Sequence, residues 1–204
     1  RAYLVISIAT VATVAELAFA AQWALLLRHA ARDSGSRVAL GVAGALLPLI
    51  AVAELCSWHA VLTTSNLGHA IEESLWGLCA ASIALGLLAI WPRVRPQQRP
   101  LLAFWCAAAA VYVAYMFAVD VPMYWARWLA DEVQGRVYLS LLQGAVDAST
   151  RWTVTDSWDV WKTEVTWMSL YFSLPVWLSI ALVHLPRLRA AARQPVSRHA
   201  ELAR

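Results

Sequence analysis

The sequence predicts an all-α integral membrane protein, a bundle of five transmembrane helices with a Trp-rich amphipathic outer segment between the fourth and fifth helices. Hydrophobic residues make up 61% of the 204 residues, charged residues only 14%, and the mean hydropathy is +0.57. A soluble domain carries about 25% charged residues. The apolar residues also form continuous runs of about 20 residues or more, which is the length that a helix needs to cross a bilayer.

Five apolar runs define the predicted helices, and polar or Pro-rich segments separate them. The runs cover residues 2–27, 38–63, 68–91, 101–121 and 165–185. The breaks are the basic segment 28–37, the tight turn 64–67, the Pro- and Arg-rich segment 92–100 and the long insertion 122–164. Asn66 is the expected N-cap of the third helix, because Asn side chains accept hydrogen bonds from free backbone N–H groups. Residues 1–186 then form one transmembrane domain, and residues 187–204 form a basic tail.

The distribution of basic residues predicts the orientation in the membrane. Eleven of the 16 Lys and Arg residues fall on the side of the C-terminal tail, and the other five fall on the opposite side. Because basic loops stay in the cytoplasm, we expect a cytoplasmic C-terminus and an outer N-terminus. The high content of Ala, Arg and Trp with a single Lys is typical of a GC-rich bacterial genome, so the expected membrane is a bacterial inner membrane. The basic tail indicates contact with membrane lipid, and no nucleic-acid partner is implied.

The insertion between the fourth and fifth runs is expected to be helical. Residues 131–145 place Val133, Val137, Leu141 and Leu142 on one face, as an amphipathic helix does. In residues 156–167 the three-residue steps of Trp158, Trp161, Glu164 and Trp167 predict a second helix that continues into the fifth span. We expect this segment to cover the outer mouth of the bundle.

Ionisable residues inside the predicted spans point to a site. A charged side chain costs a few kcal/mol or more in hydrocarbon, so several of them in one half of the membrane indicate a functional site or a cluster of paired polar groups. Topology brings six to the outer half: Glu54, His59, His69, Glu72, Glu73 and Asp120. Glu54 and Glu73 lie at similar depths on adjacent antiparallel helices, and His69 shares a helix face with Glu72 and Glu73. Glu16 lies in the first run and is expected to act in helix packing.

These residue types suit a metal ion or acid–base chemistry. His59, His69, Glu72 and Asp120 supply the nitrogen and carboxylate ligands of a divalent metal, namely zinc, iron or copper. Glu54 and Glu73 are the candidate catalytic acid–base groups. A haem held by the two histidines is the less favoured cofactor. The competing interpretations are a structural cluster of polar side chains and a proton or ion pathway.

Aromatic residues suggest where a hydrophobic substrate would lie. Trp76 and Tyr112 follow the polar faces of their helices, and the insertion adds the candidate substrate-binding residues Trp158, Trp161 and Trp167. The predicted function is an outward-facing intramembrane His/carboxylate site that binds a metal ion or a lipid- or quinone-like substrate, in a membrane-embedded enzyme. The alternatives are a non-catalytic accessory subunit of a larger membrane complex and a proton- or ion-coupled transporter. The first of these would have other membrane subunits as its partners.

Overall fold

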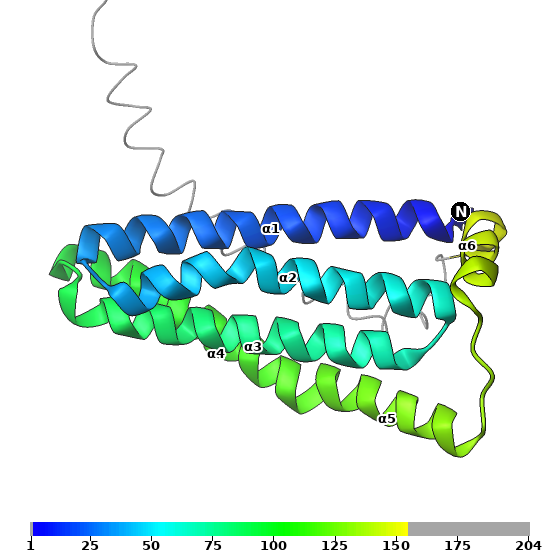
Figure 1. Cartoon of the computed structure of the whole chain (residues 1–204). Coiled ribbons are helices and arrows are strands. Elements are labelled where there is room, and N and C mark those ends of the chain that lie inside the picture. Colours follow the sequence, from blue (N-terminus) through cyan, green and yellow to red (C-terminus); the bar gives the residue numbers. More distant parts are fainter. Residues whose placement is uncertain (1, 155–204) are drawn as a thin grey trace, which may run out of the picture.

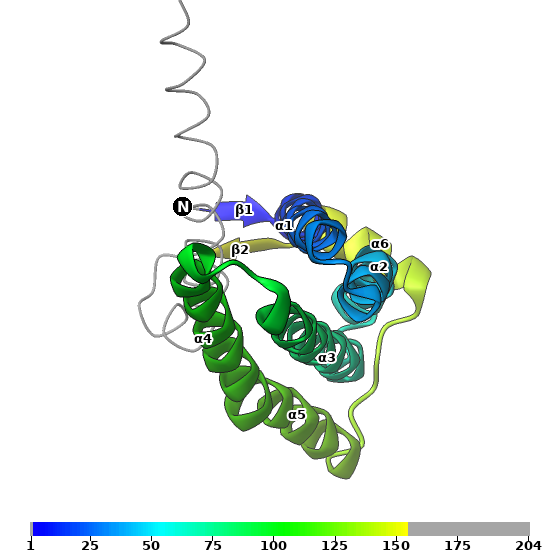
Figure 2. The same cartoon turned by 90° about the vertical axis from the view of Figure 1, so that its left-hand side faces the viewer.

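The computed structural model describes residues 2–154, which form a helical bundle with one short pair of strands. Three long antiparallel helices follow one another, and a fourth returns beside the third (Figure 1). They are α1 (Val5–Ser34), α2 (Arg37–Thr63), α3 (Asn66–Ile90) and α4 (Arg99–Tyr115). Figure 2 shows these four helices in a curved row. Its two ends are in contact, because the ring of Trp23 on α1 packs edge-on against the ring of Trp105 on α4, with centroids 6.3 Å apart.

Four helices in the described part of the chain are long and apolar enough to cross a membrane. They cover Val5–Ser34, Arg37–Thr63, Asn66–Arg93 and Pro96–Val133. Large apolar side chains such as Val11, Leu55 and Leu85 are exposed on the outside of the bundle, as lipid-facing residues are. The fifth apolar run, 165–185, lies outside the described residues, as do Trp158, Trp161 and Trp167 and the basic tail.

The first turn is shorter than the sequence predicts. The break expected over residues 28–37 shrinks to two residues, because α1 continues through its basic last turns to Ser34. Gly35 ends the helix with a φ of 66°, which glycine adopts without strain. Ser36 then caps α2 by accepting a hydrogen bond of 3.3 Å from the backbone N–H of Ala39. Charged residues at the end of a span therefore did not mark the end of the helix.

The turn between α2 and α3 brings the two helices into close contact. Thr64 takes a left-handed φ of 61°, and the N-cap of α3 is Ser65 rather than the expected Asn66. The Asn66 side chain instead donates a 2.7 Å hydrogen bond to Asp131. Gly68 lies so close to the backbone of α2 that no side chain fits between the helices.

The fourth span continues well past the expected end at residue 121. A π-helical turn, Met116–Asp120, links α4 to α5 (Val121–Val133). The segment that follows this long helix therefore begins at residue 134, whereas the sequence predicted residue 122. The side chain of Trp125 donates a 3.1 Å hydrogen bond to Ser74 of α3, which ties α5 to the bundle. The prediction of one amphipathic helix over residues 131–145 is wrong, because α5 ends at Val133 and Gly135, with a φ of 63°, does not continue it.

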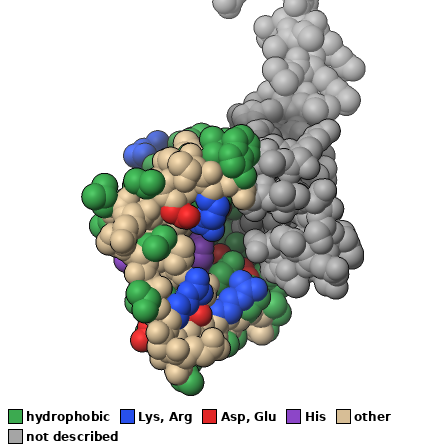
Figure 3. Space-filling view, turned by 90° about the vertical axis from the view of Figure 1, so that its right-hand side faces the viewer, with side chains coloured by type: hydrophobic (Ala, Val, Ile, Leu, Met, Phe, Trp, Pro, Cys, Tyr) green, Lys and Arg blue, Asp and Glu red, His purple; other side chains and the backbone are tan. Residues whose placement is uncertain are grey.

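A short helix and a strand pair close one end of the bundle. Helix α6 (Leu141–Thr150) lies across the ends of α1 and α2, at the end that also holds the α2–α3 turn (Figure 1). We call this the α6 end. Strands β1 (Ala2–Leu4) and β2 (Trp152–Val154) pair antiparallel beside it. Figure 3 looks onto this end, where basic, acidic and histidine side chains gather.

The cap of α6 leads to the first testable prediction. The Ser140 hydroxyl accepts from the backbone N–H of Gln143, and the Gln143 side chain accepts from that of Ser140, which forms a capping box. Ser140→Ala should destabilise α6 by about 1 kcal/mol and speed exchange of its amide hydrogens roughly fivefold. Ser149→Ala, which removes only a hydroxyl bonded to the preceding turn, is the control. Equal exchange rates in the two variants would contradict the prediction.

Candidate functional site

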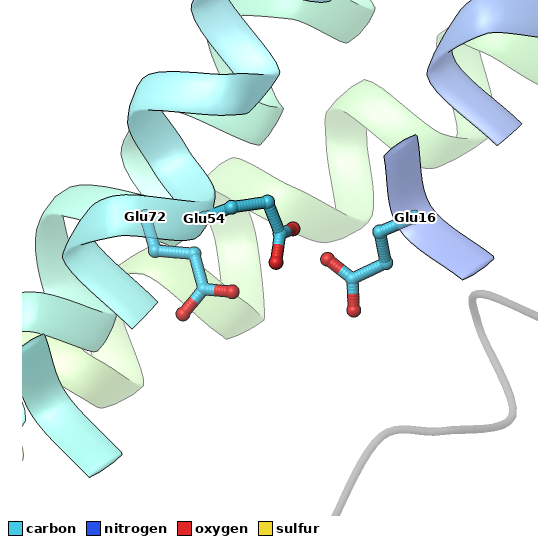
Figure 4. Close-up of side chains that lie close together, drawn as sticks. All are labelled: Glu16, Glu54 and Glu72. Atoms are coloured by element: carbon cyan, nitrogen blue, oxygen red, sulfur yellow. The ribbon is translucent and has the colours of Figure 1, made fainter. Parts of the chain in front are cut away.

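Three glutamates from three helices meet inside the bundle. Glu16 of α1, Glu54 of α2 and Glu72 of α3 each place a carboxylate oxygen within 4.8 Å of the others (Figure 4). Glu54 is only 4% exposed and Glu72 6%, whereas Glu16 is half-buried. Glu54 lies nine residues before the end of α2, so it is about 14 Å from the α6 end of that helix. We call these residues the three-glutamate cluster.

Neighbouring contacts explain why Glu16 faces the other two glutamates. The side chain of Trp58, one turn from Glu54, donates a 3.0 Å hydrogen bond to Thr13, one turn from Glu16. This bond fixes how α1 is rotated against α2. On the other side, the close approach at Gly68 holds α3 against α2 one turn before Glu72. The three acids therefore point to one place because of helix packing, and each comes from a different part of the sequence.

The hydrogen bonds within the cluster are incomplete. Glu16 shares a side-chain hydrogen bond with Glu54 and accepts another from the Trp76 indole. A hydrogen bond between two carboxyl groups requires a proton on one of them, because carboxylates only accept. Among the described residues, Oε1 of Glu54 is buried without a hydrogen-bond partner. A buried, unsatisfied polar group costs about 1–3 kcal/mol, so this oxygen is a free acceptor on one of the three carboxyl groups of the cluster.

A polar path leads from the cluster toward the α6 end. Nδ1 of His69 lies 2.8 Å from Oε2 of Glu72, and the His69 side chain is 31% exposed. Its ring lies 5.3 Å from the ring of Tyr124 on α5, and the Arg127 guanidinium lies 5.2 Å from the centroid of the same ring. His69 thus connects the buried carboxylates with the surface of the α6 end.

A second pair of acids lies on another face of α3. Glu73 shares a side-chain hydrogen bond with Asp120, which is 8% exposed at the end of the π-helical turn. Arg127 is close enough to attract the Asp120 carboxylate. Adjacent glutamates on α3 therefore both face inward, Glu72 toward α2 and Glu73 toward the π-helical turn. The two groups of acids are electrostatically coupled, because Glu73 is repelled by both Glu72 and Glu16.

The structure assembles only part of the predicted ligand set. Glu54, Glu72 and His69 come together as expected, and Trp76 lies beside them. His59 is exposed on α2, and Asp120 pairs with Glu73, so the four predicted metal ligands do not converge among the described residues. Glu16 was not among the predicted site residues, because the predicted run 2–27 places it about 21 Å from the outer end of its helix, which is deeper than Glu54.

One small apolar pocket lies next to the cluster. Its empty space is about 280 Å³, part of it open to the outside, and Tyr112, one of the predicted substrate-binding residues, lies in its wall. Other lining residues include Phe19, Trp23, Ile50, Trp76 and Ile83. Pockets for drug-sized ligands measure about 300–1,000 Å³. Because the figure of 280 Å³ includes space open to the outside, the enclosed cavity formed by residues 2–154 is much smaller than such ligands require.

The described residues define a helical protein with four helices that could cross a membrane and with a buried cluster of three carboxyl groups. Comparison with known proteins found no matching family, no similar curated protein and no similar solved structure.

Proposed function

We propose that this protein is an integral membrane protein that binds a divalent metal ion at the three-glutamate cluster. The observation that carries the proposal is the convergence of three carboxyl groups from three helices within 4.8 Å. Like charges at this distance repel one another strongly where water is scarce. A divalent cation between them would turn that repulsion into attraction. It would also supply a partner for the free oxygen of Glu54.

The proposed topology places the cluster in the outer half of the membrane. We take residues 165–185 as a fifth span, so that the N-terminus lies outside and the C-terminus in the cytoplasm, in agreement with the bias of basic residues. The α6 end then faces outward, and the charged side chains gathered on it support contact with water (Figure 3). An ion would reach the cluster from outside along His69. A bacterial inner membrane suits this arrangement.

Two observations favour an ion over the other interpretations. The small size of the apolar pocket gives little support to a lipid- or quinone-like substrate within the described residues. A purely structural cluster would satisfy its hydrogen bonds, because each buried polar atom left unpaired lowers stability. The unpaired oxygen of Glu54 is instead typical of a group kept for a ligand.

Elemental analysis of the purified protein tests the proposal. We expect the wild-type protein, dialysed against a mixture of divalent metal salts and then washed, to retain about one ion per chain. The variant with Glu16→Gln, Glu54→Gln and Glu72→Gln should retain none, because amide groups carry no charge to hold the ion. Glu132→Gln, which changes an exposed acid at the α6 end in the same way, is the matched control.

The metal-binding proposal would be wrong if wild-type and triple-variant proteins retained the same amount of every metal. Size-exclusion chromatography on both samples separates this outcome from misfolding. A variant that elutes as wild type but retains no ion supports the proposal, because only the charge of the cluster has changed.

A further inference from the structure

The chemistry of the ligand atoms narrows the class of ion, provided that the proposed function holds. Every atom that the cluster offers to an ion is a carboxylate oxygen. Nδ1 of His69 lies 2.8 Å from Oε2 of Glu72, so it is already engaged by that carboxylate. Hard cations such as Ca²⁺ and Mn²⁺ prefer oxygen ligands, whereas zinc and copper prefer sites with nitrogen or sulfur.

The spacing of the oxygens agrees with this choice. Two ligands on opposite sides of an ion are separated by twice the metal–oxygen distance. For Ca²⁺ this separation is about 4.6–5.2 Å, and for Mg²⁺ about 4.0–4.2 Å. The three oxygens all lie within 4.8 Å of one another, so small shifts of the side chains would place each of them on an ion the size of Ca²⁺.

The cluster also has oxygens to spare for a larger coordination number. Oε1 of Glu54 has no partner, and Figure 4 shows its carboxyl group between those of Glu16 and Glu72. Three carboxylates offer up to six oxygens, which suits an ion that takes six to eight ligands better than one that takes four.

From these observations we infer that the three-glutamate cluster is selective for a hard, oxygen-preferring divalent cation of the Ca²⁺ or Mn²⁺ type, with His69 as a positioning residue. His69 would not contact the ion. It would donate from Nδ1 to Glu72 and hold that carboxylate toward Glu16 and Glu54. Such outer partners of ligating groups typically change metal affinity about 10- to 100-fold.

Ion titrations of the full-length protein in detergent test the class of ion. Binding of Ca²⁺, Mn²⁺, Zn²⁺ and Cu²⁺ is measured one at a time by equilibrium dialysis at fixed pH. We expect Ca²⁺ or Mn²⁺ to bind the wild-type protein and to be lost from Glu72→Gln. Zn²⁺ or Cu²⁺ should bind no more tightly than to the triple-glutamine variant. Preferential, cluster-dependent binding of Zn²⁺ or Cu²⁺ would overturn the inference but leave the proposed function intact. Absence of binding for all four ions would overturn both.

Two variants of His69 test its role as a positioning residue. His69→Leu removes the donor and should weaken binding of the preferred ion about 10-fold or more. His69→Asn keeps a short side-chain N–H donor, so it should restore most of the affinity. His59→Leu, at an exposed histidine on α2, is the control and should bind as wild type. Equal losses in His69→Leu and His69→Asn, with both proteins folded, would make His69 a direct ligand and contradict the inference.

Discussion

Replacing Glu54 by methionine is expected to abolish binding of the divalent ion and to raise the melting temperature of the ion-free protein. Methionine fills a similar volume without a charge. It removes the buried oxygen that has no partner and the crowding of three acidic groups, and these gains should outweigh the loss of the hydrogen bond that Glu54 shares with Glu16. Replacing buried charges by apolar groups of similar volume is often neutral or stabilising by about 1–4 kcal/mol. For a chain of this size, such a gain corresponds to an increase on the order of 5 °C.

Thermal unfolding in detergent, with and without the preferred ion, measures this effect. The ion should stabilise the wild-type protein and have no effect on Glu54→Met. Glu132→Met is the control: Glu132 is exposed and loses only surface hydrogen bonds from Trp128 and Tyr138, so the melting temperature should change little. If Glu54→Met instead lowered the melting temperature of the ion-free protein, the cluster would be a structural element, as one interpretation of the sequence suggested.

The second large effect is expected at Gly68, where α2 and α3 are in closest contact. A Cβ atom at this position would overlap the backbone carbonyl of Cys56 and lie 2.8 Å from the Cβ of Ala60. Backbone atoms cannot rotate away, so the helices must separate. Gly68→Ala should therefore destabilise the protein by about 1–3 kcal/mol, the range for overpacked cores.

The same change should also weaken ion binding. Gly68 precedes Glu72 by one helical turn, so a separation of the helices there would move Glu72 away from Glu54. Thermal unfolding and equilibrium dialysis measure the two effects. Gly44→Ala on α2 is the matched control, because nothing lies within 4 Å of its added Cβ. Helix propensity predicts that Gly44→Ala stabilises by up to about 1 kcal/mol. A Gly68→Ala protein as stable as Gly44→Ala would show that the contact is not tight.

The local sequence was enough to predict the helices and one part of the site. Long apolar runs predicted α1 to α4, since a helix that crosses a bilayer must bury its own backbone polar groups and present apolar side chains. Helical spacing alone predicted the contact of His69 with Glu72, because residues three apart lie on one face. The similar depth of residues on α2 and α3 predicted that Glu54 would lie near the acids of α3.

Local sequence patterns predicted the ends of two helices wrongly. Polar residues suggested that the first span ends at residue 27 and the fourth at residue 121. Yet α1 and the α4–α5 segment continue to Ser34 and Val133. A helix can extend beyond the hydrocarbon layer, since its backbone hydrogen bonds form equally well in water. Polarity marks the limit of the apolar layer, whereas a residue with positive φ, such as Gly35, marks the end of the helix.

Only the tertiary structure decided which acids meet. Helices that are apolar on all sides carry no pattern that reveals which face turns toward which neighbour. Packing at Gly68 and the bond between Trp58 and Thr13 set those rotations. They bring Glu16 into the cluster, and the same packing leaves His59 exposed. The sequence by itself therefore determined the helical, membrane-type architecture and the half of the bundle that holds the acids. The ligand set depends on helix rotations that arise from contacts between distant segments.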